Sequence, residues 1–247
     1  MIAAAGLLVP AAAAAPQDPG PAAPGIVIKL AWKDPIPDLS GVEFDSATGP
    51  VRLDKAAITN FSVALVPCEE TSRKTWAPAA LHAILGIGPA RAGHGGTPSP
   101  FQLVHSAAET IGVGGTWTFG TINLPDTEYC AAHYLVVRAF SGSRAIDTHP
   151  EVRGLTLALD GSVRDGGGKW TRFRILTPEA YGRVIPLTTN EGKPFRGRLP
   201  NGARLTLIRD FRSIFKKLDV SRRDAKTARQ VLRNIMEHTV VEVLVGG

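Results

Sequence analysis

The sequence predicts a mainly β fold for this 247-residue chain. Short runs of alternating or β-branched apolar residues recur along it, and turn signals such as Asp165-Gly166 and Asn201-Gly202 separate them. Glycine and proline contribute 26 and 19 residues, which suits a chain with many turns. Together these observations favour an immunoglobulin-like, Greek-key β-sandwich over a parallel α/β sheet.

The clearest early strands are expected over residues 26–32 and 58–68. The first is rich in β-branched residues. In the second, Phe61 and Val63 alternate with small or polar residues, which is the period of a half-buried strand. Prolines and glycines interrupt residues 34–55, so only short strands are expected there.

A long loop is expected over residues 69–108, because glycines and prolines interrupt this stretch repeatedly. Loops of this length are uncommon and often functional. The next strand is expected over 116–124, with a bulge at Gly120 where the apolar parity switches. Residues 129–140 are apolar on both parities, as in a central strand. Further strands are expected over 155–159, 170–176, 181–187 and 204–208.

Residues 210–238 change to a helical pattern. A short helix is expected over 210–218, and Ser221 with Asp224 three residues later predicts the start of a second. Apolar residues then recur at helical spacing, so this helix is expected to pack on the sheet. A helix lying on a membrane surface is the alternative, given its arginines. A final strand is expected over 239–245.

The N-terminus predicts export. Residues 1–15 have the apolar core and small-residue cleavage region of a signal peptide, although a disordered alanine-rich tail is an alternative. Four prolines in residues 16–24 predict a stiff linker, so residues 25–247 are expected to form a single β-sandwich domain. No later stretch is apolar enough to cross a membrane. A periplasmic or secreted location follows.

Cys68 and Cys130 are the two cysteines of the chain. In an oxidising compartment such an isolated pair predicts one disulfide, which would close a loop of roughly 60 residues. Two unpaired buried thiols are the alternative if the protein is not exported. No CxxC spacing indicates zinc or redox chemistry.

Charge is distributed unevenly along the chain. Residues 1–137 carry a net charge of −4, whereas residues 138–247 carry +10. Such a basic half is typical of a surface for anionic glycan or lipid, or else of an ordinary solvated face. Export makes nucleic acid an unsuitable partner.

Common catalytic patterns are absent from the sequence. It contains no GxSxG, HExxH, Walker or GxGxxG motif. The neighbouring carboxylates Glu69-Glu70 and Asp126/Glu128 have no second feature that would separate acid–base chemistry from solvated loop charge. A non-enzymatic protein with no assigned catalytic residue is therefore expected.

Four histidines are candidate metal ligands. His82, His94 and His105 lie in or beside the predicted loop, and His133 lies on the strand that follows Cys130. A disulfide at Cys130 would bring the base of the loop near this strand, and clustered neutral imidazoles suit copper or zinc. His133 shares the parity of apolar neighbours, so an ordinary core histidine is the alternative.

The segment from Leu124 to Tyr129, Leu-Pro-Asp-Thr-Glu-Tyr, is similar to the Leu-Pro-x-Gly-x-Tyr turn of many Greek-key envelope domains, with Thr127 in place of glycine. With the two early strands and the Gly-His-Gly-Gly loop around His94, residues 25–140 resemble bacterial periplasmic β-sandwich proteins of the methanobactin-associated copper-binding type. That resemblance implies copper binding by His94 or His133.

The functional prediction is a non-enzymatic, exported envelope protein that binds a ligand, with a metal such as copper as the first candidate. The alternative is a structural or adhesion module whose basic C-terminal half contacts anionic glycan or lipid.

Overall fold

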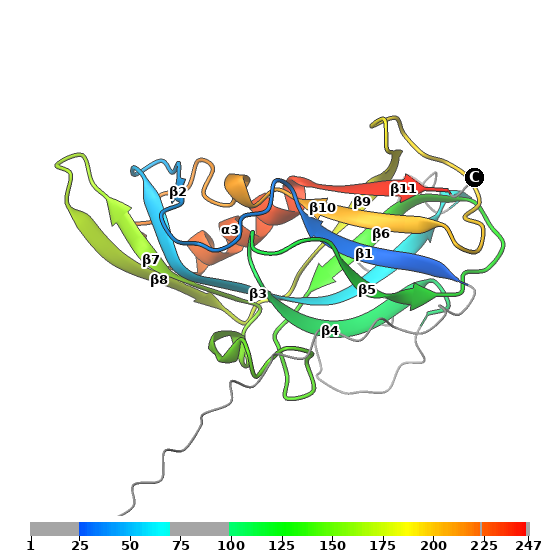
Figure 1. Ribbon diagram of the computed structural model, residues 1–247, viewed down its shortest axis with the longest axis horizontal. Coiled ribbons are helices and arrows are strands. Elements are labelled where there is room, and N and C mark those ends of the chain that lie inside the picture. The colour runs from blue at the N-terminus through cyan, green and yellow to red at the C-terminus, as the bar shows by residue number, and fades with distance from the viewer. Residues whose placement is uncertain (1–24, 70–98, 223, 246–247) are drawn as a thin grey trace, which may run out of the picture.

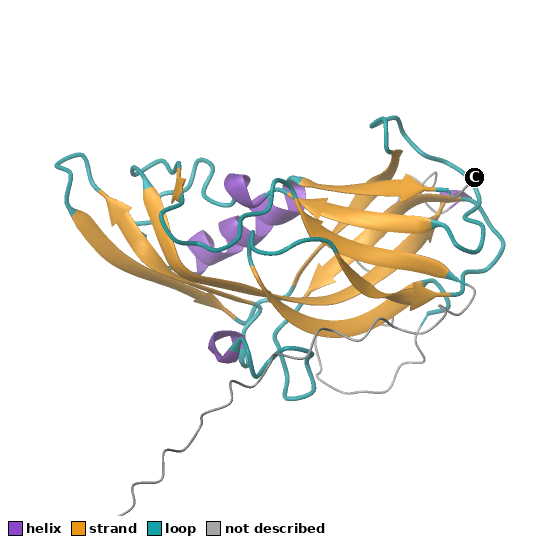
Figure 2. Cartoon of the chain, viewed as in Figure 1, coloured by secondary structure: helices purple, strands orange, loops and turns teal. Residues whose placement is uncertain are grey.

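The structure is a computed structural model that describes residues 25–69, 99–222 and 224–245 (Figure 1). The predicted signal peptide over 1–15 and linker over 16–24 lie outside these residues. Strands dominate the described part, and the α-helix α3 (Ala225–Glu237) lies against them (Figure 2). The expectation of a mainly β protein is confirmed. No helix among the described residues has the length and apolarity to span a bilayer.

The described residues form eleven strands that join one mixed sheet. Nine of them run in the order β5-β1-β10-β11-β9-β6-β3-β7-β8, and β2 and β4 pair with β3. Their bounds are β1 (Ile26–Trp32), β2 (Glu43–Phe44), β3 (Val51–Pro67), β4 (Gln102–Thr110), β5 (Trp117–Ile122), β6 (Tyr129–Val136), β7 (Leu157–Arg164), β8 (Trp170–Thr177), β9 (Tyr181–Thr189), β10 (Arg204–Arg209) and β11 (Thr239–Leu244).

The sheet curls around a core and does not confirm the predicted Greek-key sandwich. Two of its pairings, β1 with β10 and β11 with β9, are parallel. Parallel neighbours need long connections. The pairing of β1 with β10 brings strands from opposite ends of the chain together. The curl places β4 and β5 close together, although they are not paired (Figure 1).

Strand β3 is the axis of the sheet, and it corrects the expectation of only short strands over 34–55. It runs for 17 residues from Val51, so the predicted strand over 58–68 is only its second half. One edge of β3 pairs with β2 and then β4, and the other pairs with β7 and then β6. Register shifts near Leu53 and Asn60 mark bulges. Bulges bend a strand, so β3 can pair with different strands along its two halves.

Strand β4 corrects the predicted loop over 69–108, because residues from Gln102 onward pair with β3. Residues 70–98 of that loop lie outside the described part. The predicted strand over 129–140 ends at Val136. Residues 137–156, which include the one-turn 3-10 helix η1 (Pro150–Val152), form a second apolar cluster with small side chains of the sheet: Ala57, Ala108, Ala139, Ile146, Val152 and Ala158.

The cap of the C-terminal helix lies three residues after the predicted one. Asp224, not Ser221, caps α3, because its carboxylate accepts from the backbone N–H of Thr227 at 2.8 Å. Ser221 bonds to Asp219 instead. Of the helix predicted over 210–218, only the 3-10 turn η2 (Phe211–Ser213) forms. The predicted packing of α3 against the sheet is confirmed, with its apolar residues buried against β8 and β9.

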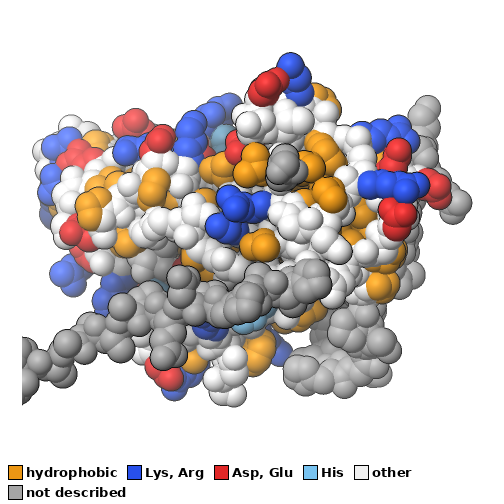
Figure 3. Space-filling model, turned by 45° about the vertical axis from the view of Figure 1, so that its right-hand side comes forward, with side chains coloured by type: hydrophobic (Ala, Val, Ile, Leu, Met, Phe, Trp, Pro, Cys, Tyr) orange, Lys and Arg blue, Asp and Glu red, His pale blue; other side chains and the backbone are white. Residues whose placement is uncertain are grey.

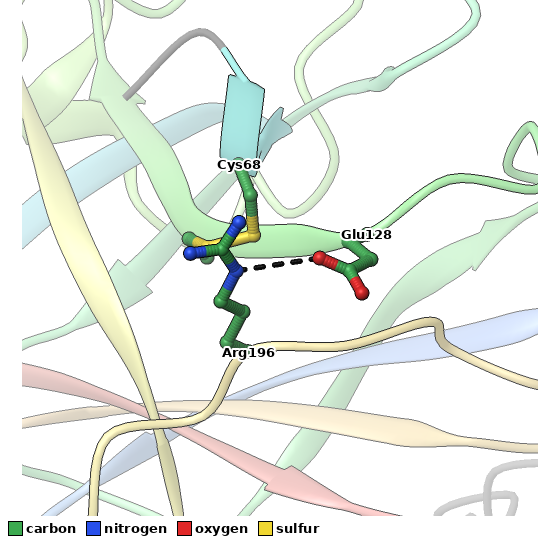
Figure 4. Close-up of a disulfide and its surroundings, with 4 residues drawn as sticks. Cys68, Glu128 and Arg196 are labelled. Atoms are coloured by element: carbon green, nitrogen blue, oxygen red, sulfur yellow. Dashed lines mark hydrogen bonds and ion pairs between the residues drawn. A yellow bond between two sulfur atoms is a disulfide. The ribbon is translucent and has the colours of Figure 1, made fainter. Parts of the chain in front are cut away.

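The predicted disulfide between Cys68 and Cys130 is confirmed, with Cα atoms 5.0 Å apart. It fastens the end of β3 to β6 (Figure 4). In the same place Arg196 pairs with Glu128 at 3.3 Å. Tyr129 donates its hydroxyl to the carbonyl oxygen of Pro125 at 2.9 Å, so the Leu-Pro-Asp-Thr-Glu-Tyr segment forms a tyrosine-anchored corner.

Candidate functional site

Of the four candidate metal ligands, the structure describes His105 and His133, which lie on opposite faces of the sheet. Side chains alternate along a strand. On β6, Tyr134 points into the core, so its neighbour His133 faces outward. On β4, Glu109 points into the core and His105 shares its parity, with its ring 5.5 Å from that of Phe119. The structure therefore does not bring His105 and His133 together.

Both histidines lie in surroundings that keep them neutral. His133 is only 7% exposed, and burial lowers its pKa to about 4. Burial and the nearby charge of Arg144 lower the pKa of His105. Within the described ranges, no three His, Cys, Asp or Glu side chains gather as metal ligands would. His82 and His94 lie outside those ranges, so copper or zinc binding there stays a prediction.

A buried ion pair lies inside the curled sheet. Arg209 on β10 is fully buried, and the side chain of Glu109 on β4 is only 11% exposed. The guanidinium reaches both carboxylate oxygens, with Nη2 at 3.1 Å from Oε2. It also donates from Nε to the carbonyl oxygen of Ala31 at 3.3 Å and lies 4.0 Å from the ring centroid of Trp32.

Other side chains complete the hydrogen bonding of Glu109. Trp32 and Trp117 donate their indole N–H groups to Oε2 at 3.2 and 3.1 Å. Asn60 donates its amide to Oε1 at 2.6 Å and accepts the hydroxyl proton of Tyr134. These contacts join six strands through one set of side chains, here called the Glu109 cluster: Trp32, Asn60, Glu109, Trp117, Tyr134 and Arg209.

The Glu109 cluster is electrostatically satisfied. Burial opposes ionisation of Glu109, but the charge of Arg209 and hydrogen bonds from its neighbours outweigh it and hold the pKa of this carboxyl below its usual value. Burial raises the pKa of Tyr134 to about 12. The Glu109 carboxylate already accepts hydrogen bonds from five donors, so it has no acceptor site left for a substrate. We therefore interpret the cluster as a structural link that stabilises the curled sheet.

Sequence reasoning missed the Glu109 cluster. Glu109 follows directly on the predicted loop, and Arg209 follows directly on a predicted strand, where a charge ordinarily marks an exposed end. The sequence held only one weak indication of this cluster. Trp32 and Arg209 each stand at the end of an apolar run, and the parallel pairing of those two runs places them side by side.

Ion pairs across the molecule explain part of the charge asymmetry. Arg198 pairs with Asp126 at 3.0 Å, as Arg196 does with Glu128, and both pairs join the basic half to the acidic half. Arg209 and Glu109 do the same in the core. Figure 3 shows acidic and basic side chains interleaved at the right-hand end of the molecule. The basic half is therefore not one uninterrupted basic face.

Arginines do gather on the wing, the part of the sheet formed by residues 51–58 of β3 with β7 and β8. The wing lies at the end of β3 opposite the disulfide, and α3 lies over its inner side (Figure 1). Alternating residues such as Val163 and Phe173 are buried on that side. The intervening residues face outward and form what we call the arginine face: Arg52, Arg164, Trp170, Arg172 and Arg174.

The register of the wing sets the spacing of the arginine face. Arg52 and Arg172 flank Ser162 in one row across the three strands, and Arg164 pairs with Trp170 in the next row. The guanidinium carbons of Arg52 and Arg164 lie 4.4 and 5.4 Å from the centroid of the Trp170 ring. Stacking on an aromatic ring holds a guanidinium in place while leaving its N–H edge accessible.

Arg52 and Arg174 of this face pair with carboxylates, and Arg172 is not free either. Arg52 pairs with Glu43 at 2.5 Å and Arg174 with Asp160 at 3.0 Å, both at the surface. No carboxylate of the described residues lies within ion-pair distance of Arg164. Surface pairs of this kind contribute about 0–1 kcal/mol, so an incoming anion can exchange with them. The arginine face can thus bind carboxylate, sulfate or phosphate groups in two adjacent rows.

The chain matches no protein-family model, no curated protein and no solved structure. Function is therefore inferred from the residues of the chain itself.

Proposed function

We propose that the protein is an exported, non-enzymatic binding module that holds an anionic glycan on the arginine face. The stacked arrangement of Arg52, Trp170 and Arg164, with Arg172 in the adjoining row, carries this proposal. The guanidiniums come from three strands, so the ordered sheet, and not a loop, positions their donors.

A polymer suits this surface better than a bilayer does. The wing bows around α3, so its outer face curves away from a plane (Figure 1). A chain of sugars can follow such a curve and present anionic groups to successive rows of arginines. The Trp170 ring is covered by the guanidiniums of Arg52 and Arg164, whereas a membrane anchor would project freely outward.

Export is supported by the disulfide and by the N-terminal sequence. Cysteine pairs that are oxidised persist in secreted and envelope compartments. Anionic polysaccharides are components of those compartments, whereas nucleic acid is not a usual one.

Binding to defined polymers tests the proposal. The probes are heparin and polygalacturonate as polyanions and dextran as the neutral control, with affinity measured between about 50 and 300 mM salt. Arg164→Ala is expected to weaken polyanion binding about tenfold, since one charge-assisted contact contributes about 1.5–3 kcal/mol. Arg204→Ala, which removes an exposed arginine from β10, is the matched control. Binding that weakens with salt supports the proposal, because contacts between exposed charges are screened.

Three outcomes would contradict it: equal losses in Arg164→Ala and Arg204→Ala, salt-insensitive binding, or equal affinity for dextran. Stronger binding to phosphatidylglycerol vesicles than to either polyanion would assign the face to lipid instead.

A further inference from the structure

We propose that the outer edge of β8 binds an extended peptide of a partner protein in which apolar and acidic residues alternate. The peptide would add a strand to the wing and insert one apolar side chain into a pocket beside β8. This proposal uses the backbone of β8 and the inner side of the wing, and it does not depend on glycan binding by the arginine face.

The outer edge of β8 is open, since no other described strand pairs with it. Asp165 donates its backbone N–H to the carbonyl of Lys169 at 3.0 Å, which sets the phase of the β7–β8 ladder. In an antiparallel pair, every second residue bonds to the partner strand. Thr171, Phe173 and Ile175 therefore bond to β7, and residues 170, 172, 174 and 176 turn their backbone groups to the open edge.

A pocket of about 150 Å³ lies on the inner side of this edge. Its lining comes from β7, β8, the turn between them, the β2–β3 turn and the segment before α3: Thr48, Val163, Asp165, Thr171, Phe173, Val220 and Ser221. An apolar cavity of this size can hold a benzene-sized group. Thr171 and Phe173 both line it, so an inward-facing side chain of a strand added beside β8 would lie next to the pocket.

The outer side of the added strand would meet positive charge. Arg172 and Arg174 alternate with the pocket-lining residues and face outward. Cross-strand neighbours of opposite charge stabilise a sheet, so acidic residues are favoured at the outward positions of the peptide. Apolar residues facing the pocket and acidic residues facing the arginines give an alternating apolar–acidic pattern.

A second copy of the same chain does not fit this edge. If two β8 strands paired antiparallel with their outer faces on the same side, outward residues would oppose outward residues. The rows containing Arg172 and Arg174 would then meet each other. Like charges opposite one another destabilise strand pairing, and positive charge on an edge strand commonly prevents self-association. An acidic partner avoids this repulsion.

The test measures binding of a fluorescently labelled nine-residue peptide that alternates leucine and glutamate, using fluorescence anisotropy. Arg174→Pro removes a backbone donor from the open edge, whereas the β7 ladder does not use that N–H. Arg174→Ala removes the same side chain but keeps the donor. We expect Arg174→Ala to weaken binding about threefold and Arg174→Pro to weaken it at least about tenfold further.

Thr171→Trp fills the pocket from a position whose backbone bonds to β7, and it is expected to weaken binding by at least about tenfold. If Arg174→Pro lowers the thermal stability too far for a binding measurement, the affinity of Thr171→Trp tests the proposal instead. A peptide with lysine in place of glutamate should bind at least about tenfold more weakly.

Equal affinities for the two Arg174 variants, or unchanged affinity in Thr171→Trp, would overturn the proposal. Peptide binding that survives in Arg164→Ala, while polyanion binding is lost, would separate this edge from the arginine face.

Discussion

Arg209 and Glu109, 100 residues apart in the sequence, form a two-pronged ion pair inside the curled sheet. Arg209 lies on β10 and Glu109 on β4, strands that are not hydrogen-bonded neighbours. Their contact therefore crosses the core and holds two remote parts of the sheet together.

Breaking this pair should destabilise the protein strongly. Glu109→Gln leaves the Arg209 charge buried without a counter-charge, which costs about 3–5 kcal/mol. In a chain of this size we expect a fall of about 10 °C in Tm. Urea unfolding measures the free energy of unfolding. Arg153→Ala is the control, because the ion pair of Arg153 with Asp147 is exposed and its loss should lower this free energy by less than about 1 kcal/mol. Similar losses of unfolding free energy in both variants would show that the pair between Arg209 and Glu109 does not stabilise the curled sheet.

The same carboxylate should make stability depend on acid pH. Because the pKa of Glu109 is lowered in the folded protein from its ordinary value of 4.5, the unfolded chain binds its proton first as pH falls. The contribution is complete above about pH 4.5 and is lost as pH falls through the folded-state pKa. Urea unfolding between pH 6 and 3 should show a shallower acid loss for Glu109→Gln than for the unchanged protein. Parallel curves would contradict this assignment.

His133 should titrate far below an ordinary histidine. Burial lowers its pKa from 6.5 to about 4, so the unfolded chain takes up this proton first and stability falls as pH drops from about 6.5 to 4. An NMR titration of the imidazole signals should show one ring with a midpoint near 4. His133→Gln should remove part of the pH dependence of unfolding in that window. A midpoint near 6.5 would mean that the ring is solvated.

The disulfide should stabilise the fold by restricting the unfolded chain. Cys68 and Cys130 are separated by 62 residues, and loss of such a link typically costs about 2–5 kcal/mol. Replacing both cysteines with serine should lower the free energy of unfolding by this amount. Adding a reductant should lower the stability of the unchanged protein to the same level and leave the double variant unaffected.

The capping residue of α3 gives a prediction with a built-in control. Asp224→Ala removes the hydrogen bond to the N–H of Thr227 and should cost about 1 kcal/mol. Ser221→Ala should change the free energy of unfolding by less than about 0.5 kcal/mol, because Ser221 does not cap the helix. A larger loss of unfolding free energy in Ser221→Ala than in Asp224→Ala would indicate that Ser221 is the cap.

Most of the strands, the disulfide and the helix that packs on the sheet could be predicted from the amino-acid sequence. Those features follow from local patterns: β-branched residues in β1, period-two alternation in the second half of β3, an isolated cysteine pair, and helical spacing after Asp224. The prediction failed at Gln102–Thr110, because this strand contributes a histidine and a glutamate to the inner side of the sheet and so lacks an apolar alternation.

The pairing of the strands and the contacts between charged side chains could not be predicted from the sequence, because both depend on how the chain folds in three dimensions. The parallel pairing of β1 with β10 joins segments from opposite ends of the chain, and no local pattern specifies it. The net charge of the C-terminal half did not reveal that Arg209 is buried against Glu109, or that Arg52 and Arg164 stack on Trp170. Alternation along one strand determines which face a side chain takes, whereas its neighbours on that face depend on the register between strands.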